Sequence, residues 1–234
     1  TLRVRRGPGR YSEHSVELPP AGTLMDALER VSARDADAPA YAHSCHHGSC
    51  GTCGVLADGK PVLPCLKPAA EYGERVQLDP LPQYPVIVDL AVDRSPLFAN
   101  LPTDWDNLRP SEANRDSQPP PELAGGYTRF ENCIECGLCE AACPVTVLFR
   151  GPAALARLNR IAEKDPEAAS DAITEAGAEG GVWACQRSLQ CSFVCPVGVN
   201  PAKHIAVLRR KIEKRGNTAA SNGAAANGAE SSRG

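Results

Sequence analysis

Seven cysteines in the second half of the chain form two groups that each end in Cys-Pro. The first group has the spacing C-x2-C-x2-C-x3-C-P from Cys133 to Pro144, and the second has C-x5-C-x3-C-P from Cys185 to Pro196. The first spacing is typical of bacterial ferredoxins, in which the fourth cysteine ligates the other cluster of a pair. The sequence therefore predicts two iron–sulfur clusters built from interleaved cysteines.

This interleaving gives one cluster four cysteines and the other three. The predicted ligands of a [4Fe-4S] cluster are Cys133, Cys136, Cys139 and Cys195. The predicted ligands of the second cluster are Cys143, Cys185 and Cys191. Ser188 stands where a ferredoxin has the middle cysteine of the second group, and three thiolates suit a [3Fe-4S] cluster better than a four-iron one. We expect Ser188 to fill the vacant corner as a neighbour, with ligation by its hydroxyl as the alternative.

Four further cysteines near the amino terminus have the spacing C-x4-C-x2-C followed by a distant fourth. They are Cys45, Cys50, Cys53 and Cys65. This is the plant-type spacing, which predicts a [2Fe-2S] cluster. The loop is rich in glycine, which lets backbone N–H groups come close to cluster sulfurs because no side chain holds the backbone away.

Hydrophobic patterns around this loop predict a small sheet with one helix, as in a β-grasp ferredoxin domain. Residues 2–5 alternate as an edge strand that pairs with residues 11–18. Thr23-x-x-Asp26 resembles a capping box at the start of a helix. Asp58-Gly59 between two short apolar runs predicts a hairpin that brings Cys65 to the loop. Further strands are expected at 76–78 and 86–88.

The second half of the chain is predicted to be an all-α, bacterial-ferredoxin-like domain. Helices are expected to begin at Pro152, Pro166 and Pro201, because proline suits the first position of a helix. Prolines gather between the halves, and the carboxyl end is mostly Gly, Ala, Asn and Ser. The predicted units are a [2Fe-2S] domain at 1–95, a linker at 96–127, the helical domain at 128–215 and a flexible tail at 216–234.

Composition narrows the classes of partner. The net charge of −3 favours neither nucleic acid nor an anionic membrane surface as main partner. No apolar run reaches the roughly 18–20 residues of a membrane span, so no transmembrane segment is expected. The arginines of residues 1–10 have no apolar segment behind them, so no export signal is expected, and eleven cysteines then favour metal over disulfides.

Each signal also has an alternative explanation. Structural zinc is the alternative at both sets of cysteines. His46 and His47 allow a Rieske-type site, although four thiolates are already present, and we expect these histidines to tune the site or contact solvent. The basic face of the helix beginning at Pro201 is expected to be solvated, with docking near a membrane as the alternative. Trp183 is expected to be a packing residue.

Residues 1–215 resemble the iron–sulfur subunit of succinate dehydrogenase and fumarate reductase, the complex II family. Four stretches carry the resemblance: Ser44-Cys45-x4-Cys50-Gly51-x-Cys53, Pro85–Leu90 with Asp93 and Phe98, Cys133-Ile-Glu-Cys-Gly-Leu-Cys139, and Cys191-x3-Cys195-Pro196-x3-Asn200-Pro201-Ala202. The order and spacing of all eleven cysteines fit the family.

The resemblance implies an electron-transfer subunit of an oxidoreductase, with substrate oxidation on a partner. In the family this subunit sits between an FAD-containing flavoprotein that oxidises succinate and membrane-anchor subunits where quinone is reduced. The clusters run in a line, with [2Fe-2S] nearest the flavin and [3Fe-4S] nearest the quinone. A peripheral position on the cytoplasmic face of the cell membrane is expected.

The sequence departs from the family around the expected quinone pocket. Many members have serine and then tryptophan after Cys-Pro, and histidine after the cysteine equivalent to Cys185. Here Val145 and Thr146 follow Pro144, and Gln186 follows Cys185. Pro144, Thr146 and Gln186 are therefore candidate quinone contacts, and another redox centre on the anchor is the alternative acceptor.

Three classes of function follow from the sequence. The first is the iron–sulfur subunit of a succinate:quinone oxidoreductase. The second is the equivalent subunit of a fumarate reductase or of another flavin-linked oxidoreductase. The third is a metal-bound adaptor without redox function, which optical and spin-resonance spectra would distinguish from the other two.

Overall fold

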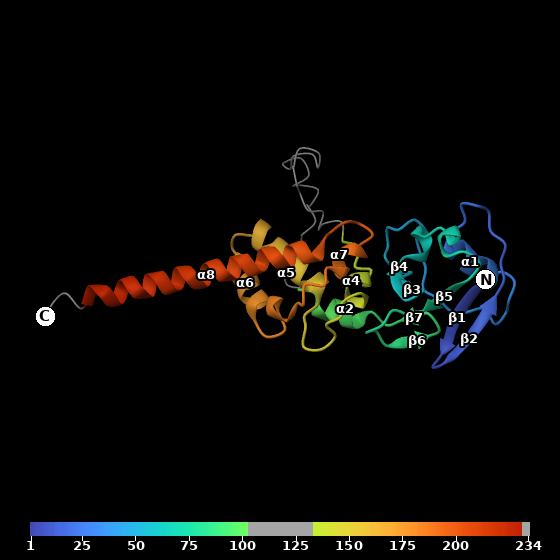
Figure 1. Ribbon diagram of the computed structural model, residues 1–234, viewed down its shortest axis with the longest axis horizontal. Coiled ribbons are helices and arrows are strands. Elements are labelled where there is room, and N and C mark those ends of the chain that lie inside the picture. Colours follow the sequence, from blue (N-terminus) through green and yellow to red (C-terminus); the bar gives the residue numbers. More distant parts are fainter. Residues whose placement is uncertain (103–132, 231–234) are drawn as a thin grey trace.

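A computed structural model describes residues 1–102 and 133–230, and within the last helix it describes side chains up to residue 217. A sheet half, which carries the amino terminus, lies beside a helical half along the long axis of the molecule (Figure 1). The fold is α+β, as the sequence predicts. Most of the predicted linker at 96–127 lies outside the described residues.

Five strands form the main sheet in the order β2-β1-β5-β3-β4. They are β1 (Leu2–Gly7), β2 (Arg10–His14), β3 (Val55–Ala57), β4 (Lys60–Val62) and β5 (Val76–Asp79). The prediction of an edge strand at 2–5 is wrong, because β1 pairs antiparallel with β2 on one side and parallel with β5 on the other. The alternation of residues 2–5 reports one buried face and cannot show how many neighbours a strand has.

Helix α1 (Leu24–Ser32) packs on the main sheet, with Leu24, Leu28 and Val31 buried against it. The predicted capping box is present. The hydroxyl of Thr23 accepts the Asp26 N–H at 3.1 Å, and the Asp26 carboxylate accepts the Thr23 N–H at 2.7 Å. Such a cap stabilises a helix by about 1 kcal/mol, so it defines the residue at which α1 begins.

The predicted hairpin joins β3 and β4 through Asp58 and Gly59. Both residues have positive φ, 46° and 76°, as the turns favoured in two-residue hairpins require. The short helix η1 (Pro64–Leu66) follows at once and carries Cys65, which is buried. The hairpin therefore brings the fourth cysteine back to the loop of the first three.

The strand predicted at 86–88 forms, but outside the main sheet. β6 (Val86–Val88) pairs with β7 (Ala91–Val92) in a separate two-stranded sheet, and its side chains are exposed. A short helix η2 (Ala69–Tyr72) precedes β5, and α2 (Ser95–Asn100) follows β7.

All described elements from residue 133 onward are helical. They are α4 (Leu138–Ala141), α5 (Pro152–Lys164), α6 (Ala169–Gly177), η4 (Val182–Ala184), α7 (Gln190–Phe193) and α8 (Pro201–Glu230). Helices α5, α6 and α8 share a core that includes Leu155, Leu158 and Ile161. Within the described part of the chain, every helix is too short or too polar to cross a bilayer.

The predicted tail at 216–234 differs from the structure. Helix α8 continues through residues 216–230 and projects away from the rest of the molecule (Figure 1). Alanine is frequent in this stretch and has the highest helix propensity, so the helix continues where the sequence lacks an apolar face. Residues 231–234 lie outside the described residues.

Candidate metal-cluster sites

The first group of thiols lies on the loop that follows α1 and on η1. Cys53 and Cys65 are buried, and their Sγ atoms are 3.5 Å apart. Cys45 and Cys50 are partly exposed, and all eleven cysteines of the chain are free thiols. The four side chains predicted to hold a [2Fe-2S] cluster therefore come from one loop and one adjacent turn.

Backbone N–H groups point at the sulfurs of this loop. The N–H groups of Ser49 and Cys50 donate to Cys45 Sγ at 3.3 Å each, and that of Thr52 donates to Cys50 Sγ at 3.5 Å. Backbone donation from His47 is the main reason that the pKa of Cys45 is lowered to about 6. Donors of this kind stabilise negative charge on sulfur, which both a thiolate and a metal cluster carry.

The buried side of the same group behaves differently. Burial is the main reason that the pKa of Cys53 is raised to about 12. A thiol in such surroundings does not ionise by itself near neutral pH, so a bound metal has to supply the positive charge that makes it a ligand. The loop therefore combines partly exposed thiols that accept backbone N–H groups with buried thiols that need a bound metal to ionise.

Gly51 lets the first loop contact the loop of the second group. It has φ +68°, and a Cβ there would lie 2.5 Å from the Ile134 carbonyl and 2.8 Å from Cys136 Cβ. Only glycine fits both the left-handed backbone and this approach. Arg94 bridges the same two loops, because its Nη1 donates to the Gly51 carbonyl at 2.8 Å and to the Glu135 carbonyl at 3.3 Å.

The second group of thiols lines one enclosed cavity in the helical half. Its members are Cys133, Cys136, Cys139 and Cys195, the four predicted to share a cluster. Burial raises the pKa of Cys136 to about 11 and that of Cys139 well above its ordinary value. The Val199 N–H donates to Cys195 Sγ at 3.3 Å, as in the first loop. The structure therefore brings Cys195 to the cysteines of the first motif across more than fifty residues of sequence.

The third group consists of the three remaining thiols. Burial, with a smaller contribution from the neighbouring Cys143 and Cys185, raises the pKa of Cys191 to about 11. The Arg187 N–H donates to Cys185 Sγ at 3.4 Å. Ser188 is exposed, and both residues that flank it have left-handed backbone, so the segment after Cys185 turns sharply at the place of the missing cysteine.

Two short helices connect the second and third groups. Helix α4 carries Cys139 of the second group, and Cys143 of the third follows its end. Helix α7 carries Cys191 of the third group, and Cys195 of the second follows its end. Each helix therefore contributes cysteines to both groups, and the two helices are in contact.

The basic face of α8 is less solvated than the sequence predicts. Arg209 donates to the Val182 carbonyl at 2.6 and 2.9 Å and to the Cys185 carbonyl at 2.7 Å, and its guanidinium lies 5.6 Å from the centre of the Trp183 ring. Trp183 is 51% exposed, and it packs against Arg209 at the surface rather than in the core. Arg209 instead fixes the segment that leads into the third thiol group.

Buried polar groups near the second thiols were not predicted from the sequence. The Glu140 carboxylate accepts the Ala153 N–H at the start of α5 at 3.0 Å, and burial raises its pKa to about 7. Burial also raises the pKa of Tyr84, whose hydroxyl lies beside Gly137. The sequence carries no local signal for these contacts, because the two members of each pair are far apart in the sequence.

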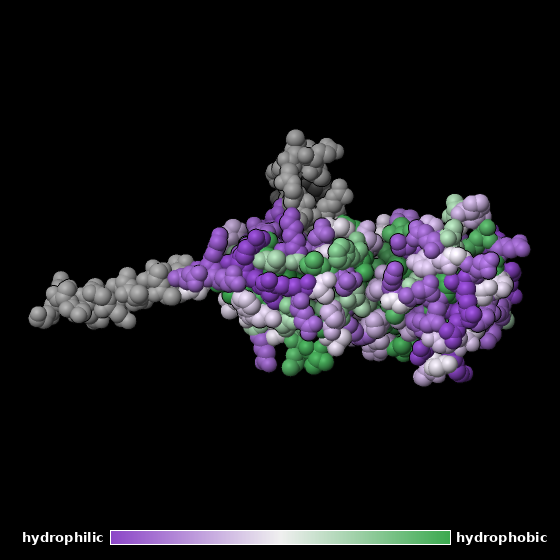
Figure 2. All heavy atoms as spheres, in the orientation of Figure 1, coloured by the Kyte–Doolittle hydropathy of each residue, from purple (hydrophilic) through white to green (hydrophobic). Residues whose placement is uncertain are grey.

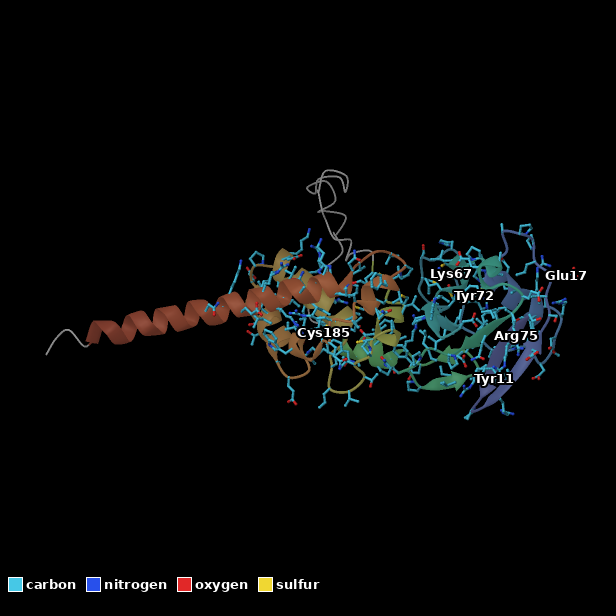
Figure 3. All side chains as sticks on the ribbon, in the orientation of Figure 1. Tyr11, Glu17, Lys67, Tyr72, Arg75 and Cys185 are labelled. Carbon is cyan, nitrogen blue, oxygen red and sulfur yellow. The ribbon has the colours of Figure 1, made fainter. Side chains whose placement is uncertain are left out.

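The three candidate quinone contacts are all exposed. They are Pro144, Thr146 and Gln186. Thr146 lines a cleft with Gln83 and Tyr84. Figure 3 places Cys185, next to Gln186, in the helical half and away from the sheet that carries Tyr11.

Large apolar side chains are exposed around the third thiol group. Figure 2 shows apolar residues gathered at the lower edge of the helical half. The exposed apolar residues that flank the three thiols in sequence are Val147, Leu148, Trp183, Leu189 and Phe193. Exposed apolar surface of this kind marks a place where another protein or lipid docks.

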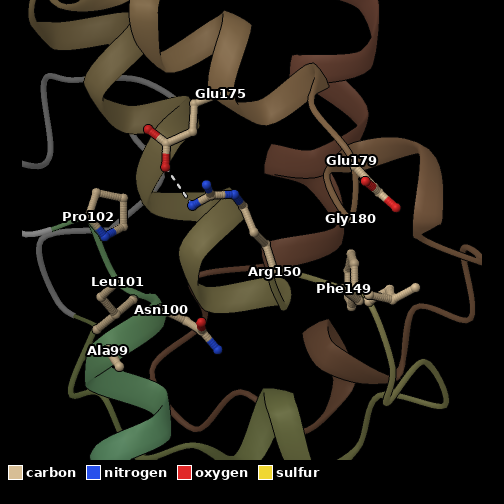
Figure 4. A pocket seen from close by; sticks show the side chains of 10 residues that line it. Ala99, Asn100, Leu101, Pro102, Phe149, Arg150, Glu175, Glu179 and Gly180 are labelled. Atoms are coloured by element: carbon tan, nitrogen blue, oxygen red, sulfur yellow. Dashed lines mark ion pairs between the residues drawn. The ribbon is translucent and has the colours of Figure 1, made fainter.

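A separate cleft of about 610 Å³ lies between the end of α2, the segment before α5 and the end of α6 (Figure 4). Arg150 and Glu175 form an ion pair in it, and no cysteine is among its described lining residues. It borders Pro102, the last described residue before residue 133. We assign no role to this cleft.

Known protein families match both halves of the chain. Residues 2–99 match a 2Fe-2S iron-sulfur cluster binding domain, and residues 129–199 match a 4Fe-4S dicluster domain. The matches cover the first thiol group in one case, and the second and third groups in the other. The chain therefore has a [2Fe-2S] domain and a [4Fe-4S] domain, which argues against structural zinc at either.

A solved structure has the same fold. The structure titled "Mycobacterium smegmatis Sdh1 complex in the apo form" contains a chain that matches with a TM-score of 0.74 at 24% identity, and the match covers 92% of this chain and 95% of that one. At this identity the likeness supports the fold alone. It extends over both halves.

Curated relatives are similar over most of their length. The fumarate reductase iron–sulfur subunit of Escherichia coli O157:H7 is 32% identical over 199 residues, covering 82% of this chain and 80% of the relative. That of Mycobacterium tuberculosis is 34% identical, covering 82% and 81%. A mitochondrial succinate dehydrogenase iron–sulfur subunit of Arabidopsis thaliana is 31% identical, covering 84% and 67%. With two cluster domains in this order and this extent of similarity, the chain belongs to the complex II family of fumarate reductase and succinate dehydrogenase iron–sulfur subunits.

Proposed function

We propose that this chain is the electron-transfer subunit of a succinate:quinone oxidoreductase, which passes electrons from a flavoprotein to quinone at a membrane anchor. The observation that carries the proposal is the continuous series of three thiol groups. The first contacts the second through Gly51 and Arg94, and the second shares α4 and α7 with the third. A series of fixed redox centres divides a long transfer into short ones.

The ligands that we propose follow the three groups. The [2Fe-2S] cluster takes Cys45, Cys50, Cys53 and Cys65; the [4Fe-4S] cluster takes Cys133, Cys136, Cys139 and Cys195; the [3Fe-4S] cluster takes Cys143, Cys185 and Cys191. When bound, such clusters accept and release single electrons. The protein supplies thiolates, backbone N–H donors to sulfur and a buried setting, all of which set the reduction potential.

The sheet half is proposed to face the FAD-containing flavoprotein, and the exposed apolar surface around the third group is proposed to face the anchor. Pro144, Thr146 and Gln186 are proposed to border the quinone there, on the cytoplasmic face of the membrane. Their exposure beside apolar neighbours supports a site completed by another subunit.

Fumarate reduction is the second candidate function. It is favoured by the relatives of 32–34% identity, which are named fumarate reductase subunits. Both directions use the same series of centres, and second-shell groups that set the potentials decide between them.

The test is to purify the complex with its co-purifying subunits and record its electron paramagnetic resonance (EPR) spectra. A reduced [2Fe-2S] signal and an oxidised [3Fe-4S] signal are expected, and zinc with neither signal would overturn the proposal. Comparing succinate oxidation with quinol-driven fumarate reduction then assigns the direction. A faster rate of succinate oxidation is expected, and the reverse ratio assigns the complex as a fumarate reductase.

A further inference from the structure

Three metal-binding side chains meet on the surface of the sheet half, outside the cysteine groups. Glu29 comes from α1, and His43 and His46 come from the loop that carries Cys45. One potential ligand atom from each lies within 4.8 Å of the others. The two histidines are exposed, so an ion has access from water.

Hydrogen bonds link the three side chains in series, from Glu29 to His46 to His43. His46 Nδ1 lies 2.8 Å from the Glu29 carboxylate, and His46 Nε2 lies 2.9 Å from His43 Nδ1. A neutral imidazole that donates its Nδ1 hydrogen to a carboxylate presents the lone pair of Nε2 on its other side. Histidines that bind metals are oriented by carboxylates in the same way.

The spacing of the two facing nitrogens suits a shared ion. Two nitrogens bound to one tetrahedral Zn²⁺ at about 2.05 Å each lie about 3.4 Å apart. The observed 2.9 Å therefore needs a shift of a few tenths of an ångström. His46 is held by its left-handed backbone, φ 61°, whereas His43 packs against the Tyr41 ring at 5.1 Å between centroids and is exposed. We therefore expect the His43 ring, which is exposed, to make this shift.

We propose that Glu29, His43 and His46 form a surface site for Zn²⁺ beside the first thiol loop. His43 Nδ1 and His46 Nε2 bind the ion, and Glu29 orients His46 or adds an oxygen ligand. Two imidazoles and a carboxylate favour zinc over magnesium and calcium, which take oxygen ligands. Water completes the coordination.

Zinc at this site also affects the [2Fe-2S] centre, a step that rests on the proposed function. Cys45 lies between His43 and His46 in sequence, so a divalent cation at the site adds positive charge beside that ligand. Reduction makes the cluster more negative, and nearby positive charge stabilises the reduced state. Bound zinc therefore raises the [2Fe-2S] midpoint potential.

The experiment uses the purified complex with its clusters in place. Adventitious metal is removed first, and Zn²⁺ is then titrated in competition with a chromophoric chelator. Wild type is expected to have a site that His43→Gln and Glu29→Gln each weaken at least tenfold. His47→Gln is the matched control, because His47 lies in the same loop but contacts the Cys45 carbonyl instead, and it is expected to keep the wild-type affinity. Equal zinc affinity in wild type, His43→Gln and Glu29→Gln would overturn the site.

The redox readout separates this inference from the proposed function. Zinc is expected to raise the [2Fe-2S] midpoint potential in wild type and in His47→Gln, but not in His43→Gln. Tight zinc binding without that rise would refute the coupling and leave the site standing. Absence of any [2Fe-2S] signal before zinc is added would refute the proposed cluster, while the chelator titration still tests the site.

Discussion

The two halves of the molecule collect cysteines in different ways. In the sheet half, one loop and one turn supply all four thiols, within 21 residues of sequence. In the helical half, α4 and α7 each contribute to both thiol groups, so neither group can form without the segment between them. A local site tolerates loss of its neighbours, whereas interleaved sites depend on each other. The following predictions test that difference, in order of decreasing effect.

The largest effect is expected from Cys195→Ser. It removes a proposed [4Fe-4S] ligand from the end of α7, the helix that also holds Cys191. We expect the [4Fe-4S] signal to disappear and the [3Fe-4S] signal to fall strongly, while the [2Fe-2S] signal persists. EPR spectra of the purified complex measure all three.

Cys65→Ser is the matched variant in the sheet half. It should abolish the [2Fe-2S] signal and leave the two signals of the helical half in place. If Cys65→Ser reduces those signals as strongly as Cys195→Ser does, the contrast between local and interleaved sites is incorrect.

Gly51→Ala tests the contact between the first thiol loop and the loop of the second thiol group. The new Cβ would lie 2.5 Å from the Ile134 carbonyl on a left-handed backbone, which costs about 3 kcal/mol of stability. Thermal unfolding should shift down, and freeze-quench EPR should show slower transfer from the [2Fe-2S] to the [3Fe-4S] centre. Gly59→Ala is the control, because it has the same backbone strain with nothing within 4 Å. It should cost about 1 kcal/mol and leave the transfer rate unchanged.

Ser188→Cys restores the cysteine that the third group lacks. The side chain is exposed in the turn after Cys185, at the position of the missing cysteine. We expect the oxidised [3Fe-4S] signal to be replaced by a reduced [4Fe-4S] signal at lower potential. Ser188→Ala should keep the [3Fe-4S] signal, and its loss would show that the Ser188 hydroxyl is a ligand.

A separate effect is expected from acid acting on the helical half. His204 is buried between α5 and α8, where Asn159 is 2.8 Å from its Nδ1, and burial lowers its pKa to about 4. Because the unfolded chain takes up this proton below about pH 6.5, stability is lost as pH falls from about 6.5 toward 4, by at most about 3 kcal/mol. Unfolding of the complex between pH 7 and 4.5 measures the slope.

His204→Gln cannot take up that proton. Its unfolding temperature should depend less on pH over the same range than that of wild type. An unchanged pH dependence would show that other groups govern acid sensitivity in this half.

The sequence could predict what local spacing determines. Cysteine spacing indicated which thiols lie together, and the capping box at Thr23 and the helix at Pro152 follow from short-range rules. Contacts between distant segments could not be predicted. The residues around Gly51 do not indicate that it lies against Cys136. Arg209 was expected to be solvated, although it donates to the Cys185 carbonyl. The edge-strand prediction failed for the same reason, because pairing partners are set by topology.

The crossing of α4 and α7 also constrains how the helical half is assembled in the cell. Cysteines before α5 and after α6 must be side by side before either of the two proposed clusters has its full ligand set. Completing either proposed cluster therefore depends on the folding of the segment that contains α5 and α6. The sheet half, in contrast, has all four thiols on one loop and one turn, so its proposed cluster does not depend on that segment.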